Sequence, residues 1–507
     1  MILDGNSFTL KNLRHELDHP SQLSISPEAS DLVNRSRNVV EHILDEGDVV
    51  YGVNTGFGRL ANEQISSDNL KQLQVNLLRS HAAGTGEYLA RRTVRLILLL
   101  KINSLLRGYS GIRLEVIEAL IYFYNNDLIP TVRERGSVGA SGDLAPLADL
   151  ALPLIGEGSF LSPDGEAIPA EMILKSHKYA TIDLREKEGL SLINGTQLST
   201  ALAIEAIFSI KDLFFTISAT GAFSTEVMLG TDTAFREEIQ QARNQVGQNY
   251  AGKLLFHLMK ESGYREAHVN CDRVQDFYSI RCMPQVHGSF YDLISYAEGI
   301  LIREANSTTD NPVTIIDDNV IVSGGNFHAA PIAHVMDFLA ITLADVASMS
   351  ERRIAAFQDS AQSSLPMFLM NKAGLNSGLM IAQVSAAALA SENKSLAHPA
   401  SVDSIPTSAN QEDHVSMAPI AGYQLRQLIN NTSHIFAIEL LCAAQARDLN
   451  PKYSLANCSD DIYHLIRQNV PYLEEDGVLS GHIEHIATLV QSGSIAEIVN
   501  QNIQDLA

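Results

Sequence analysis

Three long stretches of the chain combine helical spacing of apolar residues with a near absence of glycine and proline. Residues 198–223 and 328–356 are apolar on most sides, which is typical of buried helices, whereas residues 423–447 carry one apolar stripe. Helices of about 25 residues extend roughly 37 Å, which is more than the width of a small domain. Strands should be rare, although a Pro-Asp-Gly turn within residues 160–168 predicts a small hairpin. We therefore predict a mainly α fold with a long central helical bundle.

The glycines gather outside these stretches, in short segments whose composition indicates loops. These segments are residues 51–58, 81–86, 136–142 and 323–326. Loops on a rigid scaffold are where binding and catalytic side chains are most often found. We expect a loop-rich N-terminal part over residues 1–195, followed by the long-helix bundle and the C-terminal helices over residues 196–507.

Acidic residues outnumber basic ones by 59 to 36, which gives a formal net charge of -23. Such a charge repels phosphate backbones and anionic lipids, so neither nucleic acid nor a membrane is expected as a partner. The most apolar run, residues 96–106, is interrupted by Lys101 and Asn103 and is shorter than the roughly 20 residues that span a bilayer. The first residues carry acids and amides instead of a basic start and an apolar core, which favours a cytoplasmic location.

The cysteines and histidines form no recognisable metal or redox motif. No two cysteines have CxxC spacing, so we expect reduced thiols. The cysteines are Cys271, Cys282, Cys442 and Cys458. No HExxH pattern includes His328, His398 or His414, for which we expect structural or supporting roles and no bound metal.

Residues 135–149 contain Ala-Ser-Gly between a flexible glycine and an expected helix start at Asp143. One interpretation is a helix cap, in which Ser141 or Asp143 satisfies the first helix amides. The other is chemical: the nitrogen of Gly142 attacks the carbonyl carbon of Ala140, and Ser141 then loses water to leave a methylidene group. Glycine permits the backbone angles of this attack because it has no Cβ. Alanine leaves the carbonyl uncrowded, and serine supplies the leaving hydroxyl.

The whole stretch GSVGASGDLAPLA resembles the prosthetic-group segment of the aromatic amino acid ammonia-lyases and aminomutases. In that family the cyclised Ala-Ser-Gly is the electrophile 4-methylideneimidazol-5-one (MIO), so the resemblance implies an MIO formed from Ala140, Ser141 and Gly142. Further matching blocks stand in order along most of the chain. They are YGVNTGFG at 51–58, SLINGTQ at 191–197, FYSIRC at 277–282, TDNP at 309–312, SGGNFH at 323–328, ASENK at 390–394 and QEDHVSM at 411–417.

Two positions indicate histidine as the substrate. A dyad that contacts the aromatic ring in this family reads Ser80-His81 here, and both this dyad and Glu412 resemble the members that act on histidine. An imidazole offers one N–H donor and one acceptor nitrogen, which His81 and Glu412 can hold together. A phenyl ring would leave both groups unpaired. The resemblance therefore implies elimination of ammonia from L-histidine to give trans-urocanate.

The base that removes the β proton has two candidates. Tyr51 resembles the family's catalytic tyrosine on a mobile inner loop, and its phenol can act as a general base. The structural alternative is a loop anchor whose ring packs on Phe57. Glu412 is the second candidate for the base.

The resemblance assigns further residues to the substrate and to the electrophile. Arg281 resembles the residue that binds the substrate carboxylate through two parallel hydrogen bonds. Asn194 and Tyr278 resemble catalytic-site groups that donate hydrogen bonds as charge develops, although each could also make a structural bond. Gln275 and Phe327 match positions near the prosthetic group and the substrate, and packing roles suit them equally well.

The family resemblance also implies a homotetramer in which several subunits build each active site. On that basis Asn311, Lys394 and the loop over residues 411–417 would reach a neighbouring subunit's site, where Asn311 would help bind substrate. Where many relatives carry an acidic residue, this chain has Ala329-Ala330-Pro331, which leaves a supporting acid in doubt.

Three other functions stand beside this interpretation. An aminomutase, or a lyase acting on phenylalanine or tyrosine, is opposed by Ser80-His81 and Glu412. A helical lyase of the fumarase and aspartase type would need a Gly-Ser-Ser loop, which we do not find. A non-enzymatic scaffold would leave Ala-Ser-Gly uncyclised, and its intact mass would show no loss of two waters.

Overall fold

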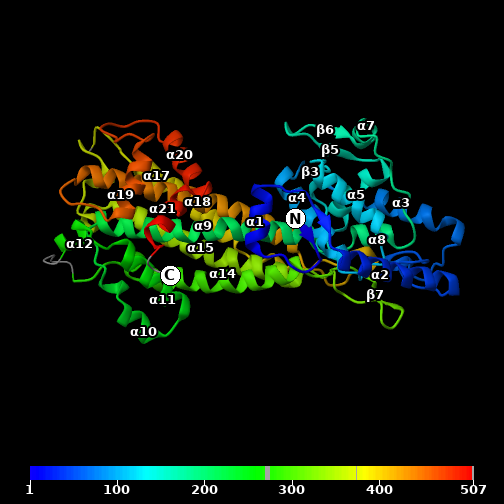
Figure 1. Ribbon diagram of the computed structural model, residues 1–507. Helices are drawn as coiled ribbons and strands as arrows, with labels where there is room; N and C mark the ends of the chain where they lie inside the picture. The colour runs from blue at the N-terminus through cyan, green and yellow to red at the C-terminus, as the bar shows by residue number, and fades with distance from the viewer. Residues whose placement is uncertain (269–273, 373, 505–507) are drawn as a thin grey trace. The chain divides into compact units, whose positions relative to one another are not determined.

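A computed structural model describes residues 1–268, 274–372 and 374–504, and helices dominate it (Figure 1). Its packing divides the chain into two compact units. The first comprises Met1–Glu205, Glu298–Met336 and Ala400–Tyr423, and the second comprises Ala206–Ala297, Asp337–Pro399 and Gln424–Ala507. The division between residues 195 and 196 stays a prediction about the order of regions along the chain. The two compact units are defined differently, because two later segments pack with the first 205 residues.

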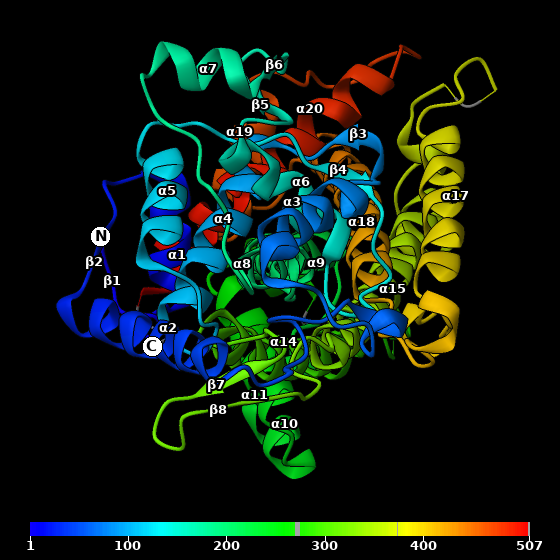
Figure 2. The same ribbon diagram turned by 90° about the vertical axis from the view of Figure 1, so that its right-hand side faces the viewer.

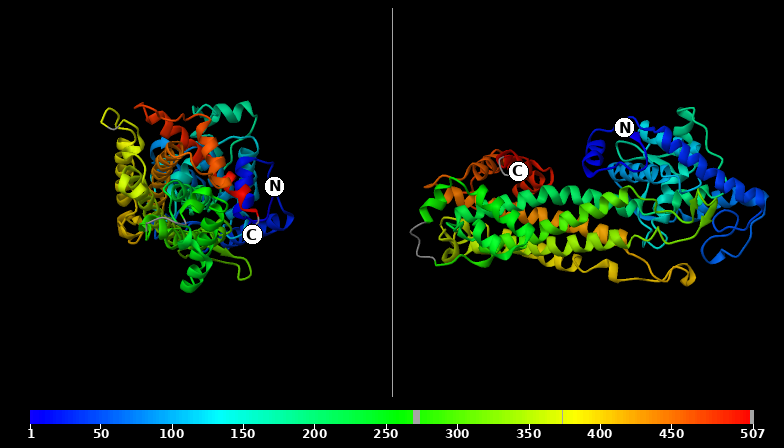
Figure 3. Two further views of the ribbon diagram at one scale, coloured as in Figure 1. Left: turned by 90° about the vertical axis from the view of Figure 1, so that its left-hand side faces the viewer. Right: turned by 60° about the horizontal axis from the view of Figure 1, so that its bottom comes forward.

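The three predicted long helices are confirmed, as is the mainly α fold. They are α9 (Gln197–Val227), α15 (Ala330–Gln358) and α18 (Ala418–Leu449), and a fourth long helix, α14 (Met283–Ala305), was not predicted. Within the second unit these helices lie side by side (Figure 3). Small and apolar side chains on several faces make such packing possible, because helices that bury most of their surface need apolar residues all round. Four of the five boundaries between the two units fall inside one of these four helices, and the fifth lies between Pro399 and Ala400.

The first unit carries the short helices and the strands. Its helices are α1 (Leu10–Asp18), α2 (Pro27–Glu46), α3 (Leu70–His81), α4 (Arg91–Leu106), α5 (Leu114–Asn125), α6 (Leu144–Ala151), α7 (Ala170–Ser176) and α8 (Glu188–Ile193). Helices α3, α6 and α8 pack against one another (Figure 2). The Ala-Ser-Gly turn directly precedes α6, so α3 and α8 flank it.

The strands form two-stranded pairs. They are β1 (Ile2–Leu3), β2 (Ser24–Ile25), β3 (Thr85–Tyr88), β4 (Arg133–Arg135), β5 (Ser159–Leu161), β6 (Ala167–Pro169), β7 (Val313–Ile315) and β8 (Val320–Val322). The predicted hairpin is confirmed, because β5 and β6 pair antiparallel with Phe160 opposite Ile168. The pair β3 and β4 holds the chain that leads into the Ala-Ser-Gly turn.

The second unit adds helices around the long ones. They are α10 (Glu237–Arg243), α11 (Val246–Leu258), α12 (Gly263–Ala267), α13 (Tyr278–Arg281), α16 (Ser360–Ser363), α17 (Met380–Leu396), α19 (Asn457–Arg467), α20 (Ser480–Gln491) and α21 (Ser494–Asn502). In the core of this unit the fully buried Arg353 donates from Nε to Glu439 at 2.6 Å. Cys282, Cys442 and Cys458 are free thiols, and Cys271 lies outside the described residues.

Helix α15 is long and apolar enough to cross a bilayer, judged by length and composition alone. In the described part of the chain, 56% of its most apolar stretch is buried against other elements. Core helices of globular proteins meet the same criterion, so this feature does not by itself predict a membrane span.

A buried acid caps α19. Glu226 accepts hydrogen bonds from the amide nitrogen of Ala456 at 2.8 Å and from the hydroxyl of Ser459. Burial raises the pKa of Glu226 to about 7, although the hydrogen bonds it accepts oppose the change. Because the folded state holds this proton more tightly than the unfolded chain, the group stabilises the fold below pH ~4.5 and loses that contribution as the pH rises to about 7.

We therefore expect Glu226→Gln to flatten the pH dependence of unfolding. Between pH ~4.5 and pH ~7.5, the free energy of unfolding of the wild type should fall by on the order of 3 kcal/mol more than that of the variant. The size follows because a pKa difference of one between the folded and unfolded states corresponds to about 1.4 kcal/mol. Urea unfolding at both pH values measures this difference. The exposed Glu497 on α21 supplies the control Glu497→Gln, which should follow the wild type. An unchanged slope in Glu226→Gln would contradict the assignment.

Candidate active site

The Ala-Ser-Gly segment forms a tight turn between β4 and α6. Gly142 has a φ of +75°, and a Cβ on it would lie 2.2 Å from the carbonyl oxygen of Gly195. Gly139 has a φ of +63°, and a Cβ there would lie 2.2 Å from Oγ of Ser416. Both positions require glycine, because other residues rarely adopt these angles and would collide with their neighbours. The packing of this turn therefore requires glycine at positions 139 and 142.

Asp143 does not act as the helix cap that one interpretation predicted. It is the residue before α6, but its side chain caps no amide of that helix. Its carboxylate accepts instead from the amide nitrogen of Ser199 at 2.8 Å and from the hydroxyls of Ser199 and Ser137 at 2.9 and 3.1 Å. Burial raises its pKa to about 6, against the hydrogen bonds from Ser199 and Ser137. Asp143 thus ties the turn to the start of α9.

Asn194 and Gly195 lie against the turn from the other side. Nδ2 of Asn194 donates to the carbonyl oxygen of Ser141 at 3.0 Å. The carbonyl of Gly195 accepts from the amide nitrogen of Asp143 at 2.7 Å. An amide donor is therefore already aimed at the carbonyl oxygen that would become the ring carbonyl of the cyclised tripeptide.

A cavity of about 670 Å³ in the first unit opens beside Ser141. Five of the residues singled out from the sequence line it, and they come from five separate parts of the chain. They are Tyr51, His81, Ser141, Asn194 and Glu412. Apolar side chains complete the wall, among them Phe57, Leu77, Leu144 and Leu190. Such a mixture of apolar surface with a few converging polar groups is typical of a small-molecule site.

Glu412 reaches the turn directly. Its Oε1 accepts from the hydroxyl of Ser141 at 2.6 Å, and its Oε2 accepts from Thr407 and Ser408 at 2.6 and 2.8 Å. Burial opposes ionisation of this carboxyl, but the three hydroxyl donors outweigh it and hold the pKa of Glu412 below its ordinary value. Glu412 is therefore a carboxylate at neutral pH.

His81 is held at the end of α3. Its Nδ1 lies 2.9 Å from the carbonyl oxygen of Leu77 and 3.1 Å from the hydroxyl of Ser80. Burial lowers the pKa of His81, although the Leu77 carbonyl and the charge of Glu412 act the other way. A neutral ring that donates Nδ1–H to Leu77 presents the lone pair of Nε2 as an acceptor.

Tyr51 enters the cavity from the first glycine loop. Its hydroxyl oxygen accepts from the amide nitrogen of Gly58 at 3.2 Å, across the glycine-rich turn that ends this loop. The bond fixes the phenol oxygen at the cavity wall, and both the catalytic role and the loop-anchor role of Tyr51 stay predictions.

The other predicted residues do not line this cavity. In the first unit, Oδ1 of Asn311 accepts from the amide nitrogen of Gly324 at 2.6 Å, and Phe327 is half-buried. In the second unit, Gln275 and Tyr278 are exposed, and the guanidinium of Arg281 lies 4.5 Å from the ring centre of Tyr278. Lys394 is exposed on α17. Nε of Arg281 is buried without a hydrogen-bond partner among the described residues, so this donor is unused within the chain.

The residues present fit an MIO. The turn needs glycine at position 142, Ala140 is nearly buried, and Oδ1 of Asn194 is buried with no hydrogen-bond partner among the described residues. Nδ2 of the same amide is committed to Ser141. That buried oxygen remains able to accept from a donor that the described residues do not supply. In residues 1–268, 274–372 and 374–504, no cluster of three or more His, Cys, Asp or Glu residues could hold a metal ion.

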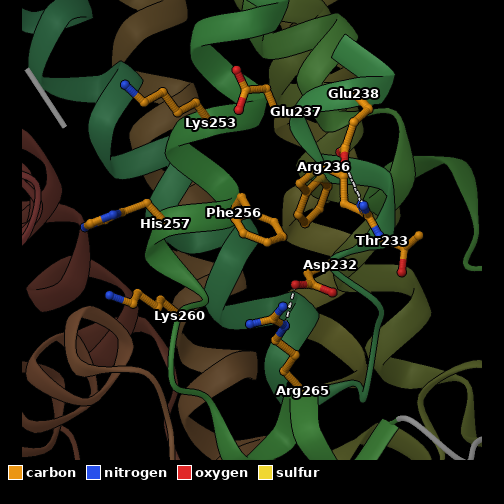
Figure 4. A pocket seen from close by; sticks show the side chains of 11 residues that line it. Asp232, Thr233, Arg236, Glu237, Glu238, Lys253, Phe256, His257, Lys260 and Arg265 are labelled. Carbon is orange, nitrogen blue, oxygen red and sulfur yellow. Dashed lines mark hydrogen bonds and ion pairs between the residues drawn. The ribbon is translucent and has the colours of Figure 1, made fainter. Parts of the chain in front are cut away.

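The second unit holds a larger cavity, of about 860 Å³. Two of its acidic residues are paired with two of its arginines: Arg236 pairs with Glu238 at 2.7 Å, and Arg265 pairs with Asp232. Lys253, His257 and Lys260 lie on the opposite side of Phe256 from these pairs (Figure 4). The basic groups thus do not converge on one point, and this cavity is not the candidate site.

Sequence reasoning missed several residues that shape the site. Thr407 and Ser408 hold Glu412, Asp143 anchors the turn, and Lys101 bonds the main chain of Asn194. Thr407 and Ser408 stand five and four positions before Glu412, and this spacing gave a weak local indication of their contact with it. Nothing in the sequence pointed to Lys101, which only interrupts an apolar run.

The comparisons with known proteins agree in family. The family model described as aromatic amino acid lyase matches residues 8–468. The chain is 47% identical to the histidine ammonia-lyase of Idiomarina loihiensis, over 98% of this chain and 97% of that relative. Its structure is similar to histidine ammonia-lyase from Trypanosoma cruzi, with a TM-score of 0.90, 38% identity and 99% and 95% of the two chains covered. It is also similar to a tyrosine aminomutase from Streptomyces globisporus, with a TM-score of 0.93, 31% identity and 99% and 98% covered.

Proposed function

Because this chain belongs to the aromatic amino acid lyase family, we propose that it is an ammonia-lyase that converts L-histidine to trans-urocanate. The observation that carries the proposal is the meeting of His81 and Glu412 with Ser141 in one cavity. Fold alone does not choose the substrate, since a histidine enzyme and a tyrosine aminomutase are both similar in structure. The side chains on the cavity wall therefore decide it.

The wall suits an imidazole ring. Neutral His81 presents Nε2 as an acceptor, and Glu412 is an acceptor as a carboxylate. A substrate imidazole can donate its N–H to one of them, and in its protonated form it can donate to both. Phenylalanine would leave both acceptors desolvated and unpaired, at a cost of roughly 1–3 kcal/mol each. This difference supplies the rejection of phenylalanine.

We also propose that Ala140, Ser141 and Gly142 cyclise to MIO with loss of two waters. This group supplies an electrophilic carbon that draws electron density from the substrate. Asn194 donates to the Ser141 carbonyl oxygen at 3.0 Å and would stabilise negative charge that develops there. Loss of the Ser141 hydroxyl removes the donor from Oε1 of Glu412, which leaves that oxygen free to accept an N–H from the substrate.

A base must take the β proton, and Tyr51 is our first choice. Its hydroxyl oxygen lies on the cavity wall and is oriented by the amide of Gly58. Glu412 is the alternative base, but Thr407 and Ser408, the hydroxyl donors that remain to it after cyclisation, hold its carboxylate at the cavity wall and suit it better to binding.

The remaining predicted residues belong to the same proposal. Arg281 would bind the substrate carboxylate with Tyr278 beside it, while Gln275, Phe327 and Asn311 would complete the substrate site. None of these side chains lines the cavity at Ser141. We propose that they are supplied by neighbouring subunits of a homotetramer, as Lys394 would be.

Exposed apolar side chains on the long helices support assembly. Phe338 and Ile341 on α15 and Ile381 and Val384 on α17 are each more than 40% exposed. Apolar surface of this kind is typical of protein interfaces. An interface variant that abolished the tetramer and kept full activity would rule out shared sites. The cytoplasmic location and the lack of nucleic-acid and membrane partners stay predictions.

Ultraviolet absorbance of the purified protein with L-histidine, L-phenylalanine and L-tyrosine tests the function. We expect a conjugated product from histidine alone. His81→Leu should raise the KM for histidine by about ten- to a hundredfold, as expected for the loss of one buried hydrogen bond. Product from tyrosine or phenylalanine with the wild-type protein would overturn the assigned substrate, and no product from any of them would favour a scaffold.

A further inference from the structure

A cluster of buried charges lies in the first unit close to Asn194. It consists of Lys101 on α4, Lys187 before α8, and Asp310, whose side chains are between 0 and 2% exposed. Nζ of Lys187 donates to Asp310 at 3.1 Å and to the hydroxyl of Ser191 at 2.9 Å. Lys187 therefore has a carboxylate partner and a structural bond within its own segment.

Lys101 has a different kind of partner. Its Nζ donates to the main-chain carbonyl oxygen of Asn194 at 2.7 Å. Burial lowers the pKa of Lys101 to about 8, while the negative charge of Asp310 opposes this change, so the side chain is an ammonium at neutral pH. A charged donor of this length gives a strong hydrogen bond in a site that excludes water.

The residue that Lys101 binds is the one that contacts the candidate electrophile. Asn194 ends α8, and its side chain donates to the Ser141 carbonyl at 3.0 Å. The next residue, Gly195, accepts from Asp143 at 2.7 Å. The ammonium is thus bonded to the main chain of the residue whose own side chain contacts the Ser141 carbonyl, and within the described residues it makes no bond to Gly195.

Burying a lysine is costly when a neutral side chain could fill the same space. An apolar residue of similar volume at a buried charged position is often neutral or stabilising. Methionine at position 101 would fill the space but would leave the Asn194 carbonyl without its donor. The ammonium therefore supplies something that packing cannot supply, namely a charged donor that anchors the main chain of Asn194, whose side chain bonds the Ser141 oxygen.

We propose that Lys101 is a positioning residue, which holds Asn194 so that its amide donates to the Ser141 carbonyl during cyclisation and turnover. This inference rests on the proposed function, because it assigns the Ser141 carbonyl to the electrophile. Lys101 does not touch the cavity and acts through Asn194 alone. Its removal should therefore be felt only while the Asn194 amide is present.

A double-mutant cycle tests this dependence. Asn194→Ala should lower kcat by about 10²–10³-fold, as the loss of one such donor does elsewhere. Lys101→Met should lower kcat by about ten- to a hundredfold with KM for histidine nearly unchanged, since small misplacements of a catalytic group have effects of that size. The double variant should match Asn194→Ala within about twofold. Multiplicative losses in the double variant would overturn the proposal.

The resting protein gives a second measurement that does not depend on turnover. A hydrogen bond to a conjugated carbonyl lowers the energy of its ultraviolet transition. Lys101→Met should therefore move the absorbance maximum of the cyclised group to shorter wavelength, and Asn194→Ala should leave no further shift for Lys101→Met to cause. An identical spectrum in Lys101→Met and wild type would contradict positioning. A folded Lys101→Met that fails to lose two waters would support it, at the cyclisation step.

Lys187→Met is the matched control. It removes an equally buried ammonium from the same cluster but no contact with Asn194. It should unfold more readily, leave the absorbance maximum unchanged, and combine multiplicatively with Asn194→Ala. If Lys187→Met shifts the spectrum as Lys101→Met does, the effect belongs to the cluster as a whole and the proposal fails.

A substitute variant and a mass measurement separate a folding defect, or a failure of the proposed function, from a failure of this inference. If Lys101→Met does not fold, Lys101→Gln, which keeps a neutral donor, takes its place in the cycle. If neither variant folds, Lys101 is a core residue and the proposal is overturned. The intact mass of the wild type separates failure of the proposed function from failure of the Lys101 inference. If the wild type has not lost two waters, the proposed function fails. If it has, only the results for the Lys101 variants bear on this inference.

Discussion

Ser141→Ala is expected to fold as the wild type does and to lose the reaction almost completely. Alanine cannot lose water across its Cα–Cβ bond, so no methylidene group can form at position 141. Losing the group that carries the chemistry costs other enzymes on the order of 10⁴-fold or more in kcat. Product formation from histidine should therefore fall below detection in an absorbance assay.

Two measurements separate this outcome from a folding defect. The intact mass of the wild type should be lower than its sequence mass by two waters, and that of Ser141→Ala should show no loss of the water that Ser141 supplies. Ser141→Ala keeps Gly139 and Gly142, which the turn requires, so thermal unfolding should change little. Ser80→Ala is the matched control, because it removes a hydroxyl from the same cavity wall and should keep the loss of two waters. Turnover by Ser141→Ala would exclude MIO as the electrophile.

Tyr51→Phe and Glu412→Gln are expected to divide the roles of base and ring binder. Removing a general base lowers the rate by about 10²–10⁴-fold. Tyr51→Phe keeps the ring and its packing and removes only the phenol oxygen that accepts from Gly58. It should lower kcat by that amount with KM for histidine nearly unchanged. A loop anchor would instead leave kcat close to that of the wild type.

Glu412→Gln should act mainly on binding. It keeps the shape of the side chain but removes the negative charge that Thr407 and Ser408 stabilise. We expect a higher KM for histidine and a weaker preference for histidine over phenylalanine. Histidine deuterated at the β carbon supplies the decisive comparison: the isotope effect on kcat should grow in the variant that lacks the base. A larger isotope effect in Glu412→Gln and not in Tyr51→Phe would make Glu412 the base and Tyr51 the ring-binding residue.

Much of the fold followed from local patterns. Three long apolar stretches predicted α9, α15 and α18 to within a few residues at each end, and Pro-Asp-Gly predicted the hairpin of β5 and β6. Such features can be recognised because their causes lie within neighbouring residues: helical periodicity, absence of glycine, and turn chemistry. Helix α14 was not singled out, since Gly288 and Gly299 interrupt its apolar pattern.

The residues that carry the chemistry of the site could also be recognised from local sequence, but the contacts that support them could not. Ala140, Ser141 and Gly142 adjoin in sequence, so the tripeptide could be recognised, as could the dyad Ser80-His81. The same local sequence allowed Asp143 to be a helix cap, and only the packing of Ser199 and Ser137 around its carboxylate decided otherwise. Local sequence lists the candidate bonds of a polar side chain, and distant segments select among them.

The sequence by itself therefore determined the helical class, the long helices, the tripeptide and the residue types that suit an imidazole. Tertiary structure alone decided that Glu412 meets Ser141 across 271 residues of chain, that Nδ1 of His81 faces Leu77, and that Lys101 ends on Asn194. The reason is physical. Periodicity and turn chemistry depend on neighbours a few residues away, whereas the charge state and direction of a buried polar group depend on whichever distant atoms exclude water from it and bond to it.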